Sequence, residues 1–311
     1  MAWRERGYRG VVALSLALTG SLAQAGPYSA MYVFGDSLSD VGNDALISGT
    51  AIPLKPVFTD GTSTGRFTNG QNYIDGLAGY LGLSVDKEYG GSGAGLVSTY
   101  LVIEELAKVD LLTAMIVHDQ NVSPRIIANH GPDELKRRLV PRFVSGELEC
   151  SIAWTEPQAG SDGTAIRTAA VRDGDEVLIN GSKIFTTFGD RADMHLVYAR
   201  FGPSSGAKGI GTIVVERDRP GLTVRKLEGK MGVRGAAENE LFFDNVRVPA
   251  ANIVTLGDPG NSRGFVKPLT IYNGTRVGMG VMALGVAEGA FELAREYMTV
   301  REQFGQKLSE M

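Results

Sequence analysis

The spacing of hydrophobic and polar positions divides the chain into a helical part, a strand-rich part and a second helical part. Residues 96–116 are predicted to be helical because apolar side chains fill one wide face at helical spacing. Helix continues over residues 121–129 after a break at Pro124. A further helix starts at residues 131–134, with a proline and acidic residues in its first turn, and stops before Pro141.

Between residues 150 and 248 the hydrophobic period becomes that of strands. A hairpin turn is predicted at residues 172–175, and a second one at Asn180-Gly181. The further strands are expected over residues 194–200, 209–215 and 240–246.

Residues 275–310 return to a helical pattern with one apolar stripe, which is expected to be mainly core packing rather than a cofactor site. The stripe consists of Val277, Val281, Leu284, Phe291, Ala294 and Met298.

The composition is that of a soluble globular protein. The chain has 311 residues, 43% of them hydrophobic and 21% charged, with a net charge of -4. The acidic balance argues against a nucleic-acid partner. We predict no metal site and no integral membrane segment. Cys150 is the only cysteine, so no internal disulfide can form, and it is expected to be a small buried apolar residue.

Residues 1–25 have the pattern of an export signal. The basic n-region contains Arg4, Arg6 and Arg9, and an apolar run follows over residues 11–22. Residues 23–25 (AQA) match a small-x-small cleavage site, so a mature chain would begin near residue 26. The apolar run is too short to span a bilayer comfortably, and the alternative is a short buried helix.

A candidate nucleophile follows the predicted signal. Residues 32–34 favour a strand, and the turn after it would lift the Ser37 hydroxyl off the strand end. Residues 35–43 (GDSLSDVGN) and 65–70 (GRFTNG) resemble the GDSL family of esterases and lipases, and the resemblance covers residues 26–85. It implies a fragment of an α/β hydrolase fold with Ser37 as nucleophile. The alternative is a relic strand and turn with an exposed serine.

The base that Ser37 needs is not found in the sequence. A serine nucleophile requires a base, usually histidine, and the GDSL family carries an Asp-x-x-His pattern near its C-terminus. His118, His130 and His195 are the three histidines, and none of them fits that pattern.

Most of the chain, from about residue 86 onward, resembles the acyl-CoA dehydrogenases. The motifs that carry the resemblance are residues 155–162 (TEPQAGSD), 173–183, 230–234 (KMGVR), 242–249 (FFDNVRVP) and 301–305 (REQFG). This resemblance implies an α+β fold with a helical segment, a middle β domain and one long C-terminal helix of an incomplete bundle. We therefore divide the chain into residues 1–25 (signal), 26–85 (GDSL-type fragment), 86–149 (helical part), 150–255 (β domain) and 256–311 (start of the C-terminal helical domain).

The resemblance also implies an FAD site. A flavin needs hydrogen bonds along its ring edge and a flat surface against its face. The resemblance implies a strand that passes the pyrimidine edge of the ring, formed by Ile152, Trp154 and Thr155. It implies a tight turn at the pyrophosphate, formed by Gly160 and Ser161. Phe185 would cover the ring, and Thr187 would donate to its reactive nitrogen. The alternative is an ordinary β-core strand with threonines.

Two further groups follow from the same resemblance. Arg301, Gln303 and Phe304 match the segment that reaches the cofactor of a neighbouring subunit, which implies a homo-oligomer; the alternative is a solvated helix end. Ser161, Thr275 and Arg276 match positions that contact acyl-CoA.

The implied reaction is α,β-dehydrogenation of an acyl-CoA thioester, with an electron-transfer flavoprotein as electron acceptor. The family's base is a later glutamate or one at the position of Thr275, and neither location supplies a carboxylate here. We therefore expect a truncated enzyme that is weak or inactive, a fusion of two gene fragments, and an uncovered apolar face on the long helix. The alternatives are an exported ester hydrolase that uses Ser37 and a non-catalytic FAD or acyl-CoA-binding remnant. The export signal conflicts with the cytoplasm implied by FAD and acyl-CoA.

Overall fold

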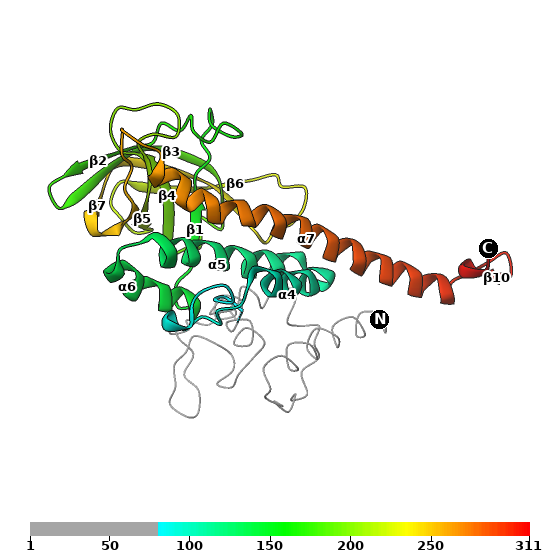
Figure 1. Ribbon diagram of the computed structural model, residues 1–311. Helices are drawn as coiled ribbons and strands as arrows, with labels where there is room; N and C mark the ends of the chain where they lie inside the picture. The colour runs from blue at the N-terminus through cyan, green and yellow to red at the C-terminus, as the bar shows by residue number, and fades with distance from the viewer. Residues whose placement is uncertain (1–79) are drawn as a thin grey trace, which may run out of the picture. The chain divides into compact units, whose positions relative to one another are not determined.

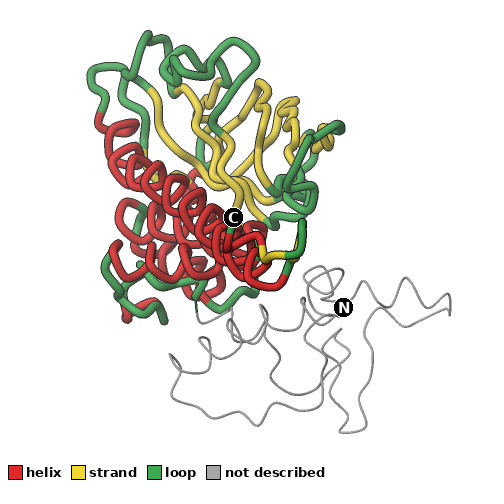
Figure 2. Tube along the Cα trace, turned by 90° about the vertical axis from the view of Figure 1, so that its right-hand side faces the viewer, coloured by secondary structure: helices red, strands yellow, loops and turns green. Residues whose placement is uncertain are grey.

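The computed structural model describes residues 80–311, which form one of the two units into which the chain divides. A layer of helices lies against an eight-stranded sheet in this unit (Figure 1 and Figure 2). The predicted export signal, Ser37 and most of the GDSL-type segment lie outside the described residues.

Three helices precede the sheet: α4 (Leu96–Val109), α5 (Leu111–His130) and α6 (Asp133–Val144). The predicted continuous helix over residues 96–116 is wrong, because α4 ends at Val109 and Asp110 is extended. The Asp110 carboxylate accepts a hydrogen bond from the Thr113 N–H at 2.8 Å and thereby caps α5. One apolar pattern thus covers two helices with a sharp change of direction between them.

The two prolines expected to interrupt helices do not do so. Pro124 lies inside α5 and Pro141 inside α6, although each removes one backbone donor. Around Pro124, α5 is fixed to the first strand because the Ser123 hydroxyl donates to the Cys150 carbonyl at 3.3 Å. After Pro141, the fully buried Phe143 ring holds the last turn of α6 against the core. Tertiary packing therefore outweighs the local cost of both prolines.

The sheet has the order β6-β7-β3-β2-β4-β5-β8, with β1 beside β4. β1 and β2 run parallel to β4, and the remaining neighbours are antiparallel. The strands are β1 (Cys150–Ala153), β2 (Ala169–Asp173), β3 (Glu176–Thr187), β4 (Met194–Arg200), β5 (Ile210–Glu216), β6 (Leu222–Leu227), β7 (Glu238–Pro249) and β8 (Ile253–Thr255).

One of the two predicted hairpin turns is confirmed. Asp173 pairs with Glu176 across the turn between β2 and β3, and Gly174 takes the left-handed conformation with φ of 62°. The predicted turn at Asn180-Gly181 is wrong, because β3 continues through it. Gly181 instead marks an irregularity in the pairing with β7, and a side chain there would collide with Thr168.

The core lies between the helices and the sheet. Apolar side chains of α5, α6, β1, β4 and β5 meet there, and Cys150 is buried among them, as predicted. Burial raises the pKa of the Cys150 thiol to about 12, so it stays a neutral packing group.

The long C-terminal helix α7 (Arg263–Val300) begins and ends earlier than predicted. It packs on α4 through glycines rather than through the predicted stripe, since a side chain at Gly285 would strike the Glu104 carbonyl and one at Gly289 the Lys108 carbonyl. A 2.7 Å ion pair between Lys108 and Glu288 supports the same contact.

The predicted stripe of α7 faces outward. The exposed fractions of Val277, Leu284, Phe291 and Met298 are 57%, 50%, 65% and 42%. The interpretation of this stripe as core packing is wrong, and the expectation of an uncovered apolar face is confirmed. Figure 1 shows the end of α7 extending beyond α4 and α5.

Length and composition alone would let α7 cross a membrane, and within residues 80–311 it is the one helix that meets this test. Glycines along it, as far as Gly289, closely approach residues of α4 and α5, so this part of the helix belongs to the helical layer.

The contact between α7 and α4 predicts that replacing glycine by alanine has opposite effects on stability at two positions of α7. Gly285→Ala should lower the free energy of unfolding by about 1–3 kcal/mol, because the new methyl group overpacks the contact with α4. Gly280→Ala, where no atom lies within 4 Å of the new carbon, should raise it by about 1 kcal/mol through helix propensity. Urea unfolding curves of both variants check this, and equal effects would contradict the packing argument.

Candidate functional site

A buried ion pair joins the end of β1 to β3. Lys183 Nζ lies 2.7 Å from Glu156 Oε1, and both side chains are almost fully buried. Lys183 also donates to the Trp154 carbonyl at 2.9 Å, and the Ile184 N–H donates to the Thr155 carbonyl at 2.9 Å. These bonds hold residues 154–156 directly against β3.

Glu156 accepts several further hydrogen bonds. The backbone N–H groups of Arg167 and Thr168 donate to it at 2.6 and 2.9 Å. Burial alone would raise the pKa of Glu156, but Lys183 and these donors hold it below its ordinary value. Burial lowers the pKa of Lys183 to about 8 despite the attraction of Glu156. The sequence analysis did not identify this pair, although both residues belong to motifs that it quoted.

Phe185 presents a flat ring to solvent in a strained conformation. The pairing of β3 with β7 shifts between Lys183 and Thr186, and Phe185 takes a φ of 55°. A bulky residue with positive φ costs about 1–3 kcal/mol, and such strain occurs mostly where function requires it. Phe185 is 61% exposed, so the described part of the chain gives its ring little packing to offset the strain.

The hydroxyl of Thr187 lies near Phe185 along β3 and contacts a carboxylate. Its oxygen is 3.1 and 3.2 Å from the two carboxylate oxygens of Glu238 on β7. Lys230 Nζ lies 3.4 Å from the same carboxylate. Burial raises the pKa of Glu238, while Lys230 acts in the opposite direction. Glu238 was not foreseen, because nothing in the sequence places it opposite Thr187.

The loop after β1 leaves donors available. Glu156 and Ala159 exchange backbone hydrogen bonds of 3.1 and 2.9 Å, which closes a tight turn. Gly160 and Ser161 follow on the exposed side, and their N–H groups make no hydrogen bond within residues 80–311. This agrees with the tight turn expected there.

Ile152 in β1 and Trp154 just after it lie in more enclosed positions. The Trp154 indole stacks on Tyr198 with ring centroids 4.8 Å apart, and its edge meets Phe265 and Tyr272. Its N–H donates to the Gly163 carbonyl at 2.9 Å. Ile152 is half-buried and pairs with β4. The side chain of Trp154 therefore belongs to an aromatic cluster.

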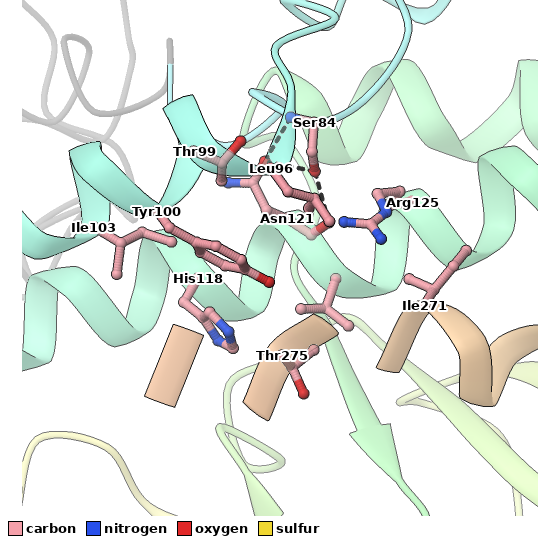
Figure 3. Close-up of a pocket in the computed structure, with 11 residues that line it drawn as sticks. Ser84, Leu96, Thr99, Tyr100, Ile103, His118, Asn121, Arg125, Ile271 and Thr275 are labelled. Carbon is pink, nitrogen blue, oxygen red and sulfur yellow. Dashed lines mark hydrogen bonds between the residues drawn. The ribbon is translucent and has the colours of Figure 1, made fainter. Parts of the chain in front are cut away.

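Thr275 and Arg276 are neighbours on α7 that differ in burial. Thr275 is buried and its hydroxyl donates to the Tyr272 carbonyl at 2.6 Å, whereas Arg276 is exposed. Thr275 also lines a small pocket between α4, α5 and α7, together with Tyr100, His118 and Arg125 (Figure 3). None of the residues that line this pocket belongs to the sheet.

The three predicted residues near the C-terminus are not brought together with Phe185. Gln303 lies in β9 (Glu302–Gln303), which pairs with β10 (Gln306–Lys307) beyond the end of α7. Phe304 is 96% exposed with a φ of 53°. Figure 1 shows this hairpin at the end of α7 that is remote from the sheet.

Two of the described histidines, His118 and His195, are buried and offer no accessible base. His195 on β4 pairs with Ser151 on β1, and their side chains are 2.7 Å apart. Both are buried, and burial lowers the pKa of His195 to about 4. This serine and histidine therefore fix the two strands to each other and cannot meet a substrate.

Three domain models of one family match the chain in order. They are the acyl-CoA dehydrogenase N-terminal domain at residues 62–147, the middle domain at residues 151–246 and the C-terminal domain at residues 262–311. The chain belongs to the acyl-CoA dehydrogenase family. The N-terminal match begins upstream of residue 86, so it includes residues 62–85, which the sequence analysis gave to the GDSL-type fragment.

Curated relatives agree with this assignment of an acyl-CoA dehydrogenase family member. The chain is 37% identical to an acryloyl-CoA reductase (NADH) of Anaerotignum propionicum, covering 75% of this chain and 59% of the relative. It is 37% identical to a short-chain specific acyl-CoA dehydrogenase of Clostridium acetobutylicum, covering 82% and 66%. The chain thus spans about three fifths to two thirds of the length of these relatives.

Solved structures show the same fold. The butyryl-CoA dehydrogenase of Megasphaera elsdenii matches with a TM-score of 0.71 and 35% identity, covering 78% of this chain and 64% of that one. A glutaryl-CoA dehydrogenase of Mycobacterium smegmatis, described in complex with FADH2, matches with a TM-score of 0.70 and 31% identity, covering 77% and 60%. The predicted arrangement of helices, β domain and C-terminal helix is confirmed.

The ion pair between Glu156 and Lys183 predicts that substitutions of these two residues have strongly coupled effects on the free energy of unfolding. Lys183→Met leaves the Glu156 charge buried and unpaired, so the free energy of unfolding should fall by about 3–5 kcal/mol. Adding Glu156→Gln removes that charge, and the double variant should recover a large part of the loss. Denaturant unfolding of both single variants and the double variant measures the coupling; additive losses would show that the pair does not act as a unit.

Proposed function

We propose that this chain is an FAD-binding oxidoreductase of the acyl-CoA dehydrogenase type, acting on an acyl-CoA thioester. The observation that carries the proposal is Phe185, which has an exposed ring and a strained backbone and lies beside the loop that follows β1. Strain without local compensation is expected where a ligand supplies the missing contact. Relatives named for acryloyl-CoA, butyryl-CoA and glutaryl-CoA support the substrate class.

The residues fit a flavin. Phe185 offers an apolar surface for the face of the flavin ring. Thr187 lies two residues further along β3, and the Thr155 carbonyl is bonded to the Ile184 N–H next to Phe185. The free N–H groups of Gly160 and Ser161 suit the pyrophosphate, because backbone donors in a turn bind anions. The pair formed by Glu156 and Lys183 holds the β1 loop and β3 in fixed relation, so both parts of the site are preorganised.

FAD, when bound, accepts the two electrons and the β-hydrogen of the thioester while a base removes the α-proton. The structure places a hydroxyl, not a carboxylate, at Thr275, and that hydroxyl is occupied by the Tyr272 carbonyl. Thr275 is therefore suited to position the substrate and cannot remove its α-proton. Arg276 is exposed next to it and is suited to hold a charged part of the substrate.

Two partners belong to the same proposal. The hairpin that carries Gln303 and Phe304 and the uncovered face of α7 are suited to contact with a second copy of the chain. An electron-transfer flavoprotein is the proposed acceptor, since one matching structure is described as the electron transferring flavoprotein of Acidaminococcus fermentans. Export by residues 1–25 stays a prediction, and it conflicts with the location that FAD and acyl-CoA imply.

Substitution of Phe185 separates binding from stability. Phe185→Gly removes the ring and relieves the positive φ, so FAD affinity should fall at least about tenfold, or ~1.4 kcal/mol, while the free energy of unfolding stays level or rises by about 1 kcal/mol. Flavin fluorescence titration and denaturant unfolding measure the two effects. Phe188→Gly is the matched control: Phe188 also has positive φ but is buried, so its loss should destabilise the chain. A wild-type chain that takes up no FAD would refute the proposed function.

The lack of a carboxylate at position 275 predicts a gain of function. In Thr275→Glu, the new carboxylate should increase the rate of anaerobic flavin reduction by butyryl-CoA at least about a hundredfold. Burial will raise the pKa of the new group, so the rate should increase with pH. Thr275→Gln has the same shape without the base and should show no increase; equal rates in the two variants would rule out a substrate α-proton near this position.

A further inference from the structure

The hydroxyl of Thr187 is already engaged by a carboxylate. Thr187 and Glu238 face each other in the register of β3 and β7, and the Thr187 oxygen is 3.1 Å from one oxygen of the Glu238 carboxylate and 3.2 Å from the other. An ionised carboxylate only accepts hydrogen bonds, so the single hydroxyl hydrogen must point toward Glu238. This orientation leaves lone pairs on the other side of the Thr187 oxygen.

Two charged groups, Lys230 and Asp119, act on Glu238 together with its burial. Lys230, in the segment between β6 and β7, has its Nζ 3.4 Å from Oε1 and also donates to the Ala236 carbonyl at 2.5 Å. Asp119 on α5 acts on Glu238 from the helical layer and is itself paired with His118 at 3.0 Å. Burial and the charge of Asp119 raise the pKa of Glu238, whereas Lys230 and Thr187 oppose the rise. Glu238 therefore takes up a proton at higher pH than an exposed glutamate.

A hydroxyl group beside a flavin can serve either state of the ring, but not both at once. The reactive nitrogen of oxidised flavin, N5, accepts a hydrogen bond, whereas the two-electron-reduced ring carries a hydrogen there and donates one. A hydroxyl that presents its hydrogen favours the oxidised ring, and one that presents a lone pair favours the reduced ring.

We propose that Glu238 is a positioning residue that sets the direction of the Thr187 hydroxyl and thereby selects which oxidation state of the flavin this hydroxyl stabilises. The inference rests on the proposed FAD site. With Glu238 ionised, Thr187 donates to the carboxylate and presents a lone pair to the flavin. With Glu238 protonated, the carboxyl group donates to Thr187, and the hydroxyl hydrogen turns to the flavin.

Glu238→Gln fixes the second arrangement at every pH. Its amide oxygen can keep the place beside Lys230, so its amide nitrogen faces Thr187 and donates to it. A direct comparison of Glu238→Gln with the wild type mixes this effect with the loss of a charge. Thr187→Val in each of the two backgrounds removes only the hydroxyl, and the charge difference cancels from the comparison.

The test is the midpoint potential of FAD bound to the full chain at alkaline pH, measured by reductive titration against a dye of known potential. In the wild-type background, Thr187→Val should lower the potential, because the reduced ring loses an acceptor. In the Glu238→Gln background, Thr187→Val should raise it, because the oxidised ring loses a donor. The affinity for oxidised FAD should fall about fivefold on Thr187→Val in the Glu238→Gln background and less than about twofold in the wild type.

The outcomes separate this inference from the function on which it rests. Shifts of the same sign in both backgrounds, or no shift in either, would overturn the role of Glu238 while FAD binding stands. A wild-type chain that binds no FAD would overturn both. Thr187→Ser keeps the hydroxyl, so in each background it should leave the potential at the value measured with Thr187, which a purely structural role of the residue would not require. Circular dichroism of each variant confirms that it is folded.

Discussion

The arrangement of the site depends on the buried contact between Glu156 and Lys183. Placing two opposite charges in the interior costs desolvation energy, which only close geometry and additional hydrogen bonds offset. Here Lys183 donates to both Glu156 and the Trp154 carbonyl, and Glu156 receives backbone donors from Arg167 and Thr168. The contact ties the segment after β1, the loop that returns to β2 and the middle of β3 to one point. Its contribution is better described as fixing one geometry than as adding stability.

The strained part of β3 follows directly from that anchor. Lys183 is held in the interior, so the irregularity in pairing with β7 falls on the next residues and turns Phe185 outward. The strand resumes its pairing at Thr186, and Thr187 then meets Glu238. The anchor at Lys183, the exposed ring of Phe185 and the oriented hydroxyl of Thr187 thus lie within five successive positions of one strand. A displacement of the anchor would move the ring and the hydroxyl together.

The sequence predicted strands and turns correctly where residues close together in the chain determine them. Strand β4 has the predicted bounds, and the turn at Gly174 follows from its short sequence signal. Tertiary contacts decided the rest. Buried neighbours carry the helices through Pro124 and Pro141, which local preference alone would end. In α7, periodicity identified the apolar residues, but the closer approach of the glycine face decided which side is buried.

The same limit applies to the site. Sequence motifs pointed to Phe185, Thr187 and the Gly160 turn, because these lie within short recognisable segments. Glu238 could not be found in this way, since it is 51 residues from Thr187 and only the pairing of β3 with β7 brings the two together. The pairing of Glu156 with Lys183, 27 residues apart, has the same origin.

The end of α7 differs energetically from its beginning. From residue 290 to residue 300 every side chain is exposed, and the last glycine contact with α4 is at Gly289. A helical segment of this length in which every side chain is exposed is marginal in water. Its amide hydrogens should exchange with solvent long before those of the first two thirds of the helix, and trypsin should cleave at Arg295 before it cleaves at Arg276. The cooperative unit of the described fold thus ends well before the helix does.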